Sequence, residues 1–296
     1  MIVTNNGNTI GPAGLGTFPL RGESMKNAML TAIKVGYRLF DSSDDYQNED
    51  GIGAGLVQCL KEGIATRDDL FLQTKVSDCD SYLTDYRQNA YFTRFSNVMN
   101  RFSVRSVVRS KVMNSLKEMN TGFLDSVLLH FPYPGFYEEM WDALIELKKE
   151  GVIRYIGVSN FSVRELEPLM KTEQKPQINE VYISPYGTKK DLVDFCNNND
   201  IQLMTYSPLG VVRERRFMND VITSIMNKYN KSMAQVILRW NSQVGSIPLP
   251  KSSNETRLKE NYYMFDFELT PEEMNCLNSL NINHQYLPIS KECPGL

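Results

Sequence analysis

The sequence is poor in the residues that build metal sites and disulfide frameworks. It has two histidines, His130 and His284, and five cysteines, which are widely spaced and never arranged as C-x-x-C. A zinc site or a disulfide framework requires closely spaced or paired ligands of these types. We therefore expect free thiols and no bound metal.

The sequence also lacks a block of basic residues and a long apolar run. Its net charge is -3 at pH 7, which offers nucleic acid or an anionic membrane surface no electrostatic attraction. No apolar run approaches the roughly 20 residues that cross a bilayer, and the polar start MIVTNNGNTI has neither the charged nor the apolar region of a signal peptide. We expect a cytoplasmic protein that binds neither nucleic acid nor membranes.

What the sequence does contain is a regular alternation of two patterns. Short apolar, β-rich segments occur at 36–41, 70–76, 124–130, 152–159, 177–183, 201–207 and 244–250, with an eighth near residue 13. Helical spacing occurs between them, at 25–35, 138–149, 163–170, 191–198 and 233–240. The alternation predicts parallel strands in a single α/β domain, residues 1–296. Its length favours a closed (β/α)₈ TIM barrel, with an open doubly wound sheet as the alternative.

One connection breaks this rhythm. Residues 77–102, between the third strand and a helix expected near Val104, are much longer than an ordinary loop. The segment is rich in aromatic residues: Tyr82, Tyr86, Tyr91, Phe92, Phe95 and Phe102. It is either a lid on the catalytic side of the barrel or an extra surface helix that packs outside it.

Polar residues gather at the predicted strand ends, where a TIM barrel builds its active site. They are Asp41 and Tyr46, Lys75, His130, Ser159 and Asn160, Glu180, and Tyr206 and Ser207. Each has a structural explanation when taken singly, for example an ion pair for Asp41 with Lys75 or a buried core position for His130. Because all would face one mouth of the barrel, together they predict a catalytic site.

Tyr46 is the candidate proton donor of this site. A tyrosine has an ordinary pKa of about 10, and a nearby lysine ammonium lowers it. Lys75 would play that part, held in place by Asp41, while His130 would orient a substrate carbonyl. The set holds no nucleophile with a paired base and no metal cluster, which argues against hydrolysis. With a hydride donor, it could reduce a carbonyl.

The blocks that carry these residues resemble the aldo-keto reductase superfamily. They include FDSSDDYQNEDGIGAGL, LDSVLLHFPYP, IRYIGVSNF and IPLPKSSNETRLKEN, in order along nearly the whole chain. The resemblance implies an NAD(P)H-dependent carbonyl reductase or alcohol dehydrogenase. It also implies that Asp41, Tyr46, Lys75 and His130 are the catalytic residues.

A basic turn near the C-terminus is the candidate binding site for the cofactor phosphate. Lys251, Ser252 and Ser253 precede a helix expected to begin near Asn254, and Arg257 follows in its first turn. Helix N-termini attract phosphate. The two cations and the hydroxyls resemble the family's grip on the adenosine 2'-phosphate, so we predict NADPH rather than NADH. An ordinary solvated basic turn is the alternative.

The resemblance implies further cofactor contacts. They are Glu260 and Asn261 with the adenine, Ser159 and Asn160 with the nicotinamide carboxamide, Tyr206 stacked on the nicotinamide ring, and Gly16, Thr17, Ser207 and Leu209 along the remaining channel.

Glu180 departs from the family pattern. The family usually reads Gln-x-Glu-x-His-Pro where this chain has Glu-Val-Tyr-Ile-Ser-Pro, starting at Glu180. A carboxylate thus replaces a carboxamide near the nicotinamide. An ionised Glu180 would favour NADP⁺ over NADPH by Coulomb attraction, whereas burial would instead protonate it.

The sequence therefore predicts an NADPH-dependent oxidoreductase that reduces an aldehyde or ketone to the alcohol, as a monomer or weak homo-oligomer. The alternative is an NADPH-binding regulatory or scaffold barrel with little turnover. Neither the physiological substrate nor the preferred direction follows from the sequence.

Overall fold

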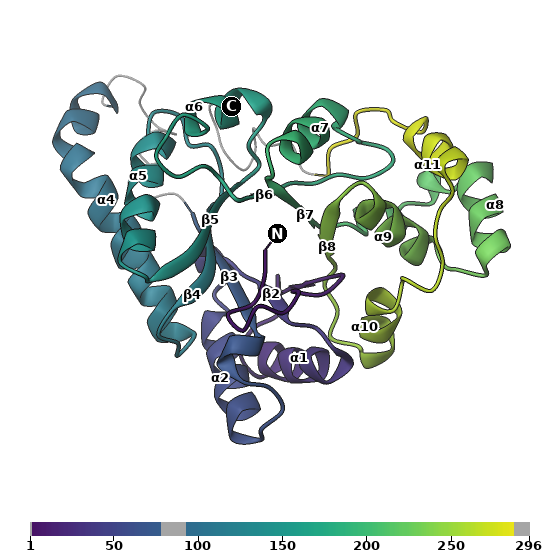
Figure 1. The fold of residues 1–296 in the computed structure, drawn as a ribbon, viewed down its shortest axis with the longest axis horizontal. Helices are drawn as coiled ribbons and strands as arrows, with labels where there is room; N and C mark the ends of the chain where they lie inside the picture. Colours follow the sequence, from purple (N-terminus) through teal and green to yellow (C-terminus); the bar gives the residue numbers. More distant parts are fainter. Residues whose placement is uncertain (1, 78–92, 287–296) are drawn as a thin grey trace.

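Eight parallel strands form a ring with the helices outside it (Figure 1). A computed structural model of the protein describes residues 2–77 and 93–286, without the side chains of 93–103, 213 and 215. The strands are β1 (Leu15–Gly16), β2 (Leu39–Asp41), β3 (Phe71–Val76), β4 (Leu124–Leu129), β5 (Ile153–Ser159), β6 (Ile178–Glu180), β7 (Gln202–Tyr206) and β8 (Ser246–Leu249).

The strands pair in sequence order, from β1 to β8. The Gly14 amide donates to the Pro248 carbonyl at 3.0 Å, which brings the first and last strands together. A doubly wound sheet reverses its strand order at a switch point, and this order does not. The predicted (β/α)₈ barrel is thus confirmed and the doubly wound alternative is wrong.

The helices surround the ring. They are α1 (Gly22–Val35), α2 (Glu49–Lys61), α4 (Thr93–Glu118), α5 (Tyr137–Lys149), α6 (Val163–Leu169), α7 (Lys190–Asn198), α8 (Asp220–Tyr229), α9 (Met233–Gln243), α10 (Glu255–Tyr262) and α11 (Pro271–Asn278). The five helices expected from spacing are present, with ends that differ by a few residues. Across the described part of the chain, no helix has both the length and the apolar character to cross a membrane.

Inside the barrel, an apolar layer at one end gives way to polar side chains at the other. Leu39, Phe71 and Ile178 pack together with Ile2 and Ile10, which belong to the N-terminal segment. That segment enters the middle of the ring in Figure 1. Strand residues alternate between faces, so the next inward position on each strand lies one layer higher. Those positions are Asp41, Gln73 and Glu180.

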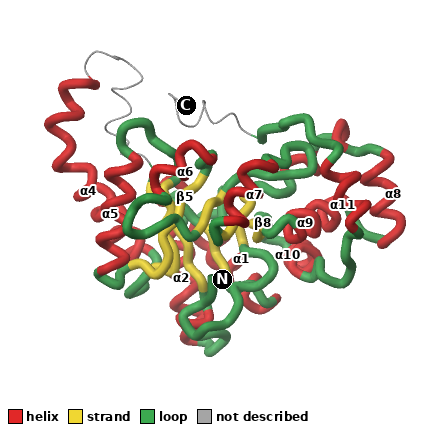
Figure 2. The backbone as a smooth tube through the Cα atoms, turned by 45° about the horizontal axis from the view of Figure 1, so that its top comes forward, coloured by secondary structure: helices red, strands yellow, loops and turns green. Residues whose placement is uncertain are grey.

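α4 begins earlier than expected. It starts at Thr93, inside the segment taken as a connection, rather than near Val104. Figure 2 shows α4 lying along the outside of α5. Exposed ion pairs join Arg105 to Asp142 and Glu146 in α5, and Arg109 to Glu150 just after it. Residues 93–102 are therefore helical. Residues 78–92, with Tyr82, Tyr86, Tyr91 and Phe92, lie outside the described residues, so the lid stays a prediction.

Candidate active site

The predicted ion pair between Lys75 and Asp41 forms inside the barrel mouth. Lys75 Nζ lies 2.6 and 2.8 Å from the two carboxylate oxygens of Asp41 and 3.0 Å from the Ser42 carbonyl oxygen. Burial alone would lower the pKa of Lys75, but the carboxyl groups of Asp41 and Glu180 raise it above its ordinary value. Lys75 is therefore a fixed positive charge.

Tyr46 ends the 3₁₀ turn at Asp44–Tyr46 that follows β2. The Lys75 ammonium lies 5.3 Å from the centre of its ring. The expected lowering of the Tyr46 pKa is wrong. Burial raises this pKa above its ordinary value; Lys75 opposes the rise, while the carboxyl groups of Asp41 and Glu180 add to it. Tyr46 therefore keeps its proton at neutral pH.

His130 follows β4 and faces Tyr46, with the two ring centres 6.0 Å apart. Burial lowers the pKa of His130 well below its ordinary value, and the charges of Lys75 and Lys111 lower it further. The imidazole is thus neutral. Ser43 Oγ lies 3.2 Å from Nδ1. When this hydroxyl donates to Nδ1, the imidazole proton is on Nε2, from which it can be donated to a ligand.

The turn that carries Tyr46 contacts α4 through Asp44. The sequence did not predict this contact. Asp44 accepts hydrogen bonds from the Ser77 amide at 3.0 Å and from Lys111 Nζ at 2.9 Å. Lys111 is distant in the sequence and belongs to a different element. No local pattern pairs it with Asp44, because the contact depends on how α4 packs against the barrel.

Glu180 lies beneath Lys75 and not at the open mouth. One carboxyl oxygen is 3.1 Å from Lys75 Nζ, and the other accepts a hydrogen bond from Gln73 Nε2 at 2.9 Å. Burial raises the pKa of Glu180 well above its ordinary value, and Asp41 adds to the rise. Sequence reasoning missed Gln73, although its position two residues before Lys75 puts both side chains on the same face of β3.

A hydrogen-bonded group of polar side chains lies beside His130 and consists of Ser159, Asn160 and Tyr206. Asn160 Nδ2 donates to Ser159 Oγ at 3.2 Å and to the His130 carbonyl at 3.1 Å, and Tyr206 Oη donates to Asn160 Oδ1 at 3.0 Å. Asn160 has a φ of 64°, in the left-handed region that few residues other than glycine adopt. The structure thus brings together the three residues assigned to the nicotinamide.

Gly16 and Thr17 lie where β1 meets β2 and β8. A Cβ on Gly16 would meet the Leu249 carbonyl oxygen at 2.6 Å, so this position has no room for a side chain. Thr17 is buried, and its hydroxyl donates to the Asp41 carbonyl at 2.8 Å. Thr17 therefore helps to hold the strand end that carries Asp41. Ser207 and Leu209 follow β7, both partly exposed.

The basic turn ends β8 and begins α10 as expected. Asn254 is the N-cap of this helix, and its side chain accepts a hydrogen bond from the Arg257 amide at 3.1 Å. The exposed residues of this region are Lys251, Ser253, Arg257 and Glu260, and the buried ones are Ser252 and Asn261. The cations are thus available to an anionic ligand at a helix N-terminus.

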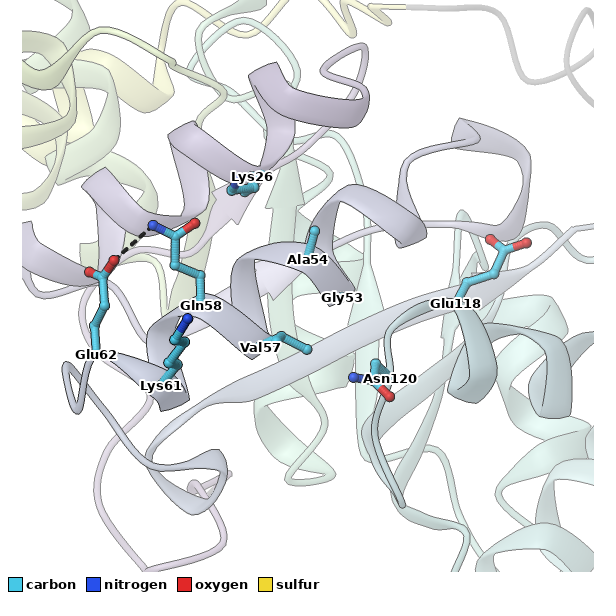
Figure 3. Close-up of a pocket in the computed structure, with 9 residues that line it drawn as sticks. All are labelled: Lys26, Gly53, Ala54, Val57, Gln58, Lys61, Glu62, Glu118 and Asn120. Carbon is cyan, nitrogen blue, oxygen red and sulfur yellow. Dashed lines mark hydrogen bonds between the residues drawn. The ribbon is translucent and has the colours of Figure 1, made fainter.

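A separate hollow of about 570 Å³ lies on the outside of the barrel (Figure 3). It is bordered by α1, α2 and the end of α4, with Lys26, Val57, Lys61 and Glu118 in its lining. None of the candidate site residues lines it. Its position on the helical layer separates it from the strand ends, where TIM barrels place their chemistry.

Comparison with known proteins identifies the family of this chain. Residues 9–282 match the model of the Aldo/keto reductase family. The chain is 38% identical to the glyoxal reductase of Bacillus subtilis, covering 93% of this chain and 90% of that protein. It is 40% identical to an uncharacterized oxidoreductase of the same organism, YtbE, covering 91% of this chain and 89% of that protein.

A solved structure of the same family has the same fold. An aldo-keto reductase of Bombyx mori in complex with NADP superimposes with a TM-score of 0.79 at 31% identity, covering 99% of this chain and 97% of that one. The chain belongs to the aldo/keto reductase family. It is accordingly an NAD(P)H-dependent oxidoreductase of the (β/α)₈ class.

Proposed function

We propose that this protein reduces an aldehyde or ketone to the alcohol with NADPH, and that Tyr46 donates the proton. The observation that supports this most is the closeness of a protonated, half-buried Tyr46 to the charged Lys75 and the neutral His130. Relatives named glyoxal reductase and methylglyoxal reductase add support for a small carbonyl substrate.

The residues fit a nicotinamide cofactor with a 2'-phosphate. Lys251 and Arg257 offer exposed cations beside the α10 N-terminus for the phosphate. Asn160 Oδ1, which accepts from Tyr206, has a second lone pair for the carboxamide NH₂, and the partly exposed ring of Tyr206 offers a surface for stacking. When bound, such a cofactor supplies the hydride that a carbonyl reduction needs.

The residues of this chain then transfer a proton to the substrate oxygen. His130 Nε2 donates a hydrogen bond to the substrate oxygen and orients it. Tyr46 Oη gives its proton to the same oxygen as negative charge develops there, since an alkoxide is a far stronger base than a phenolate. Lys75 stabilises the resulting tyrosinate, and Asp41 holds Lys75 in position at 2.6 Å.

Aromatic side chains beside the proton donor form a wall for the substrate. The Phe18 ring is 5.2 Å from that of Tyr46 and is largely exposed. The Phe131 ring stacks on His130 at 4.7 Å. These rings favour a carbonyl compound with an apolar or planar body over one covered with hydroxyls.

Replacing Tyr46 with phenylalanine tests the proposal. We expect Tyr46→Phe to lower kcat for methylglyoxal reduction by about 10²- to 10⁴-fold, because general acid catalysis contributes that much. The Kd for NADPH, measured by fluorescence titration, should stay within about twofold. Retention of a tenth of the wild-type kcat would contradict the role of Tyr46.

An NADPH-consumption panel of aldehydes, ketones and sugars separates catalysis from regulation. Turnover supports the reductase, whereas tight NADPH binding with no turnover supports the regulatory or scaffold alternative. A cytoplasmic location, a single domain and a monomer or weak homo-oligomer stay predictions.

A further inference from the structure

Gln73 forms a hydrogen-bonded layer directly below the Asp41–Lys75 pair. Its Nε2 donates to Asp41 and to Glu180, each at 2.9 Å, and its Oε1 accepts from the Ser126 hydroxyl at 2.7 Å. Turning the amide over would place its oxygen against two carboxyl groups, which fixes its orientation. A single neutral side chain thus links both carboxyl groups to the barrel wall.

Glu180 completes the surroundings of the Lys75 ammonium. An ammonium has three N–H groups. Asp41 and the Ser42 carbonyl receive bonds at 2.6 to 3.0 Å, and Glu180 lies on a further side at 3.1 Å. The side chains of Lys75 and Glu180 are each only 1% exposed. Water is therefore not available to replace these contacts.

The charges in this cluster indicate that Glu180 is a neutral acid. Two buried carboxyl groups share one ammonium, and like charges at such short range favour protonation of one of them. Burial and Asp41 both raise the pKa of Glu180, whereas Lys75 lowers it by less. The remaining titratable neighbour, Tyr46, is protonated. A neutral Glu180 gives no Coulomb preference for NADP⁺ over NADPH.

We propose that Gln73 and Glu180 are positioning residues that fix the Lys75 ammonium beside Tyr46, so that Glu180 acts on the reaction through Lys75 and not through the cofactor. This inference rests on the proposed carbonyl reduction. It replaces the nicotinamide contact expected of Glu180 from the family pattern. One carboxyl oxygen of Glu180 already lies against the Lys75 ammonium, and the other accepts a hydrogen bond from Gln73.

Kinetics with methylglyoxal and NADPH test the proposal. We expect Gln73→Leu and Glu180→Leu each to lower kcat about tenfold, the loss typical of one buried hydrogen bond to a charged group. KM for NADPH and the Kd for NADPH and NADP⁺ should stay within about twofold. In Glu180→Gln the amide oxygen can accept from Gln73 and the N–H can take the place of the acid O–H beside Asp41, so this variant should recover most of kcat.

A matched control removes a buried hydrogen bond elsewhere in the barrel. Thr205 Oγ1 and Ser246 Oγ are 2.6 Å apart and buried. Thr205→Val should leave kcat near that of the wild type. A tenfold loss of affinity for either cofactor form in Glu180→Leu or Gln73→Leu would overturn the proposal, as would an unchanged kcat in both.

A second measurement does not depend on turnover. In ¹⁵N-labelled protein, a buried and hydrogen-bonded lysine ammonium gives an observable NMR signal, which Lys75→Met assigns to Lys75. We expect this signal in the wild type, Glu180→Gln and Thr205→Val, and its broadening or loss in Gln73→Leu and Glu180→Leu. An unchanged signal in both leucine variants would overturn the proposal. A wild type without turnover would instead refute the proposed function and leave this readout intact.

Should Glu180→Leu fail to fold, Gln73→Leu carries the same test. It removes no charge and replaces one buried side chain with another of similar size. Circular dichroism and urea unfolding identify variants that are folded before kinetics are compared.

Discussion

Two sets of ion pairs in this molecule have similar geometry and very different surroundings. Lys75 and Asp41 approach to 2.6 Å with side chains that are 1% and 4% exposed. Arg105 and Asp142 approach to 2.9 Å between α4 and α5, with side chains that are 46% and 47% exposed. Water screens the second pair and not the first. At similar distances, burial therefore decides how strongly the two charges of a pair interact.

A third case is a buried carboxyl group in a different setting. Glu49, in α2, accepts a hydrogen bond from the Thr74 hydroxyl at 2.6 Å. Burial raises its pKa to about 7, with smaller contributions from the charges of Asp44 and Glu118. Burial is thus the largest cause of the raised pKa in both Glu49 and Glu180, although like charges lie near Glu49 and an ammonium lies beside Glu180.

Lys75→Met should have the largest effect on stability. It leaves Asp41 and Glu180 facing each other in a site without solvent, and breaking a buried ion pair costs about 3–5 kcal/mol. We expect the free energy of unfolding in urea at pH 7 to fall by about 3 kcal/mol. A loss below about 1 kcal/mol would mean that the two carboxyl groups share a proton at little cost.

Glu49→Gln should change how stability depends on pH. The folded-state pKa of Glu49, about 7, is above its ordinary value of 4.5. The folded protein therefore binds this proton more tightly than the unfolded chain, so the contribution is complete below about pH 4.5 and is lost as the pH rises through about 7. The variant stays neutral throughout, so relative to the wild type it should gain up to about 3 kcal/mol between pH 4 and pH 8.

Urea unfolding at a series of pH values measures this difference. Glu23→Gln provides the control, since it changes a charge that is largely exposed and paired with Lys26 at the surface. Parallel curves of stability against pH for the wild type and Glu49→Gln would show that Glu49 has the same pKa in the folded and the unfolded protein.

Lys251→Met combined with Arg257→Ala should weaken NADPH binding by at least about tenfold, or about 1.4 kcal/mol. NADH lacks the 2'-phosphate, so its Kd should change by less than about twofold. Fluorescence titration of both cofactors into both proteins gives the two ratios. Equal weakening would remove these cations from the phosphate site.

Arg105→Ala should have the smallest effect. Its exposed pairs with Asp142 and Glu146 together contribute about 1 kcal/mol or less to the free energy of unfolding, and salt should reduce that contribution further. Urea unfolding at low and high ionic strength tests this. A loss of stability as large as that of Lys75→Met would contradict the expectation that exposed ion pairs contribute less than buried ones.

Much of the fold and site follows from local patterns in the sequence. The capping box of α11, with Thr270 as N-cap and Pro271 as its first residue, depends only on neighbouring residues. The strands were predictable because alternating and apolar runs report burial directly. Their consecutive order then brought Asp41, Lys75 and His130 to the same mouth.

Contacts between segments that are distant in the sequence could not be predicted from it. The start of α4 at Thr93 was missed because the sequence there carries no strong apolar periodicity. The contact of Lys111 with Asp44 was missed because it joins a helix to a turn 67 residues away.

By itself, the sequence determined the barrel and the residues gathered at its mouth, because strand order and side-chain alternation are local properties that propagate along the chain. Only the tertiary structure decided the electrostatics of those residues. It reversed the expected pKa shift of Tyr46 and placed Glu180 on Lys75 and Gln73. The physical reason is that desolvation and hydrogen bonding depend on every group packed around a side chain, whichever part of the sequence it comes from.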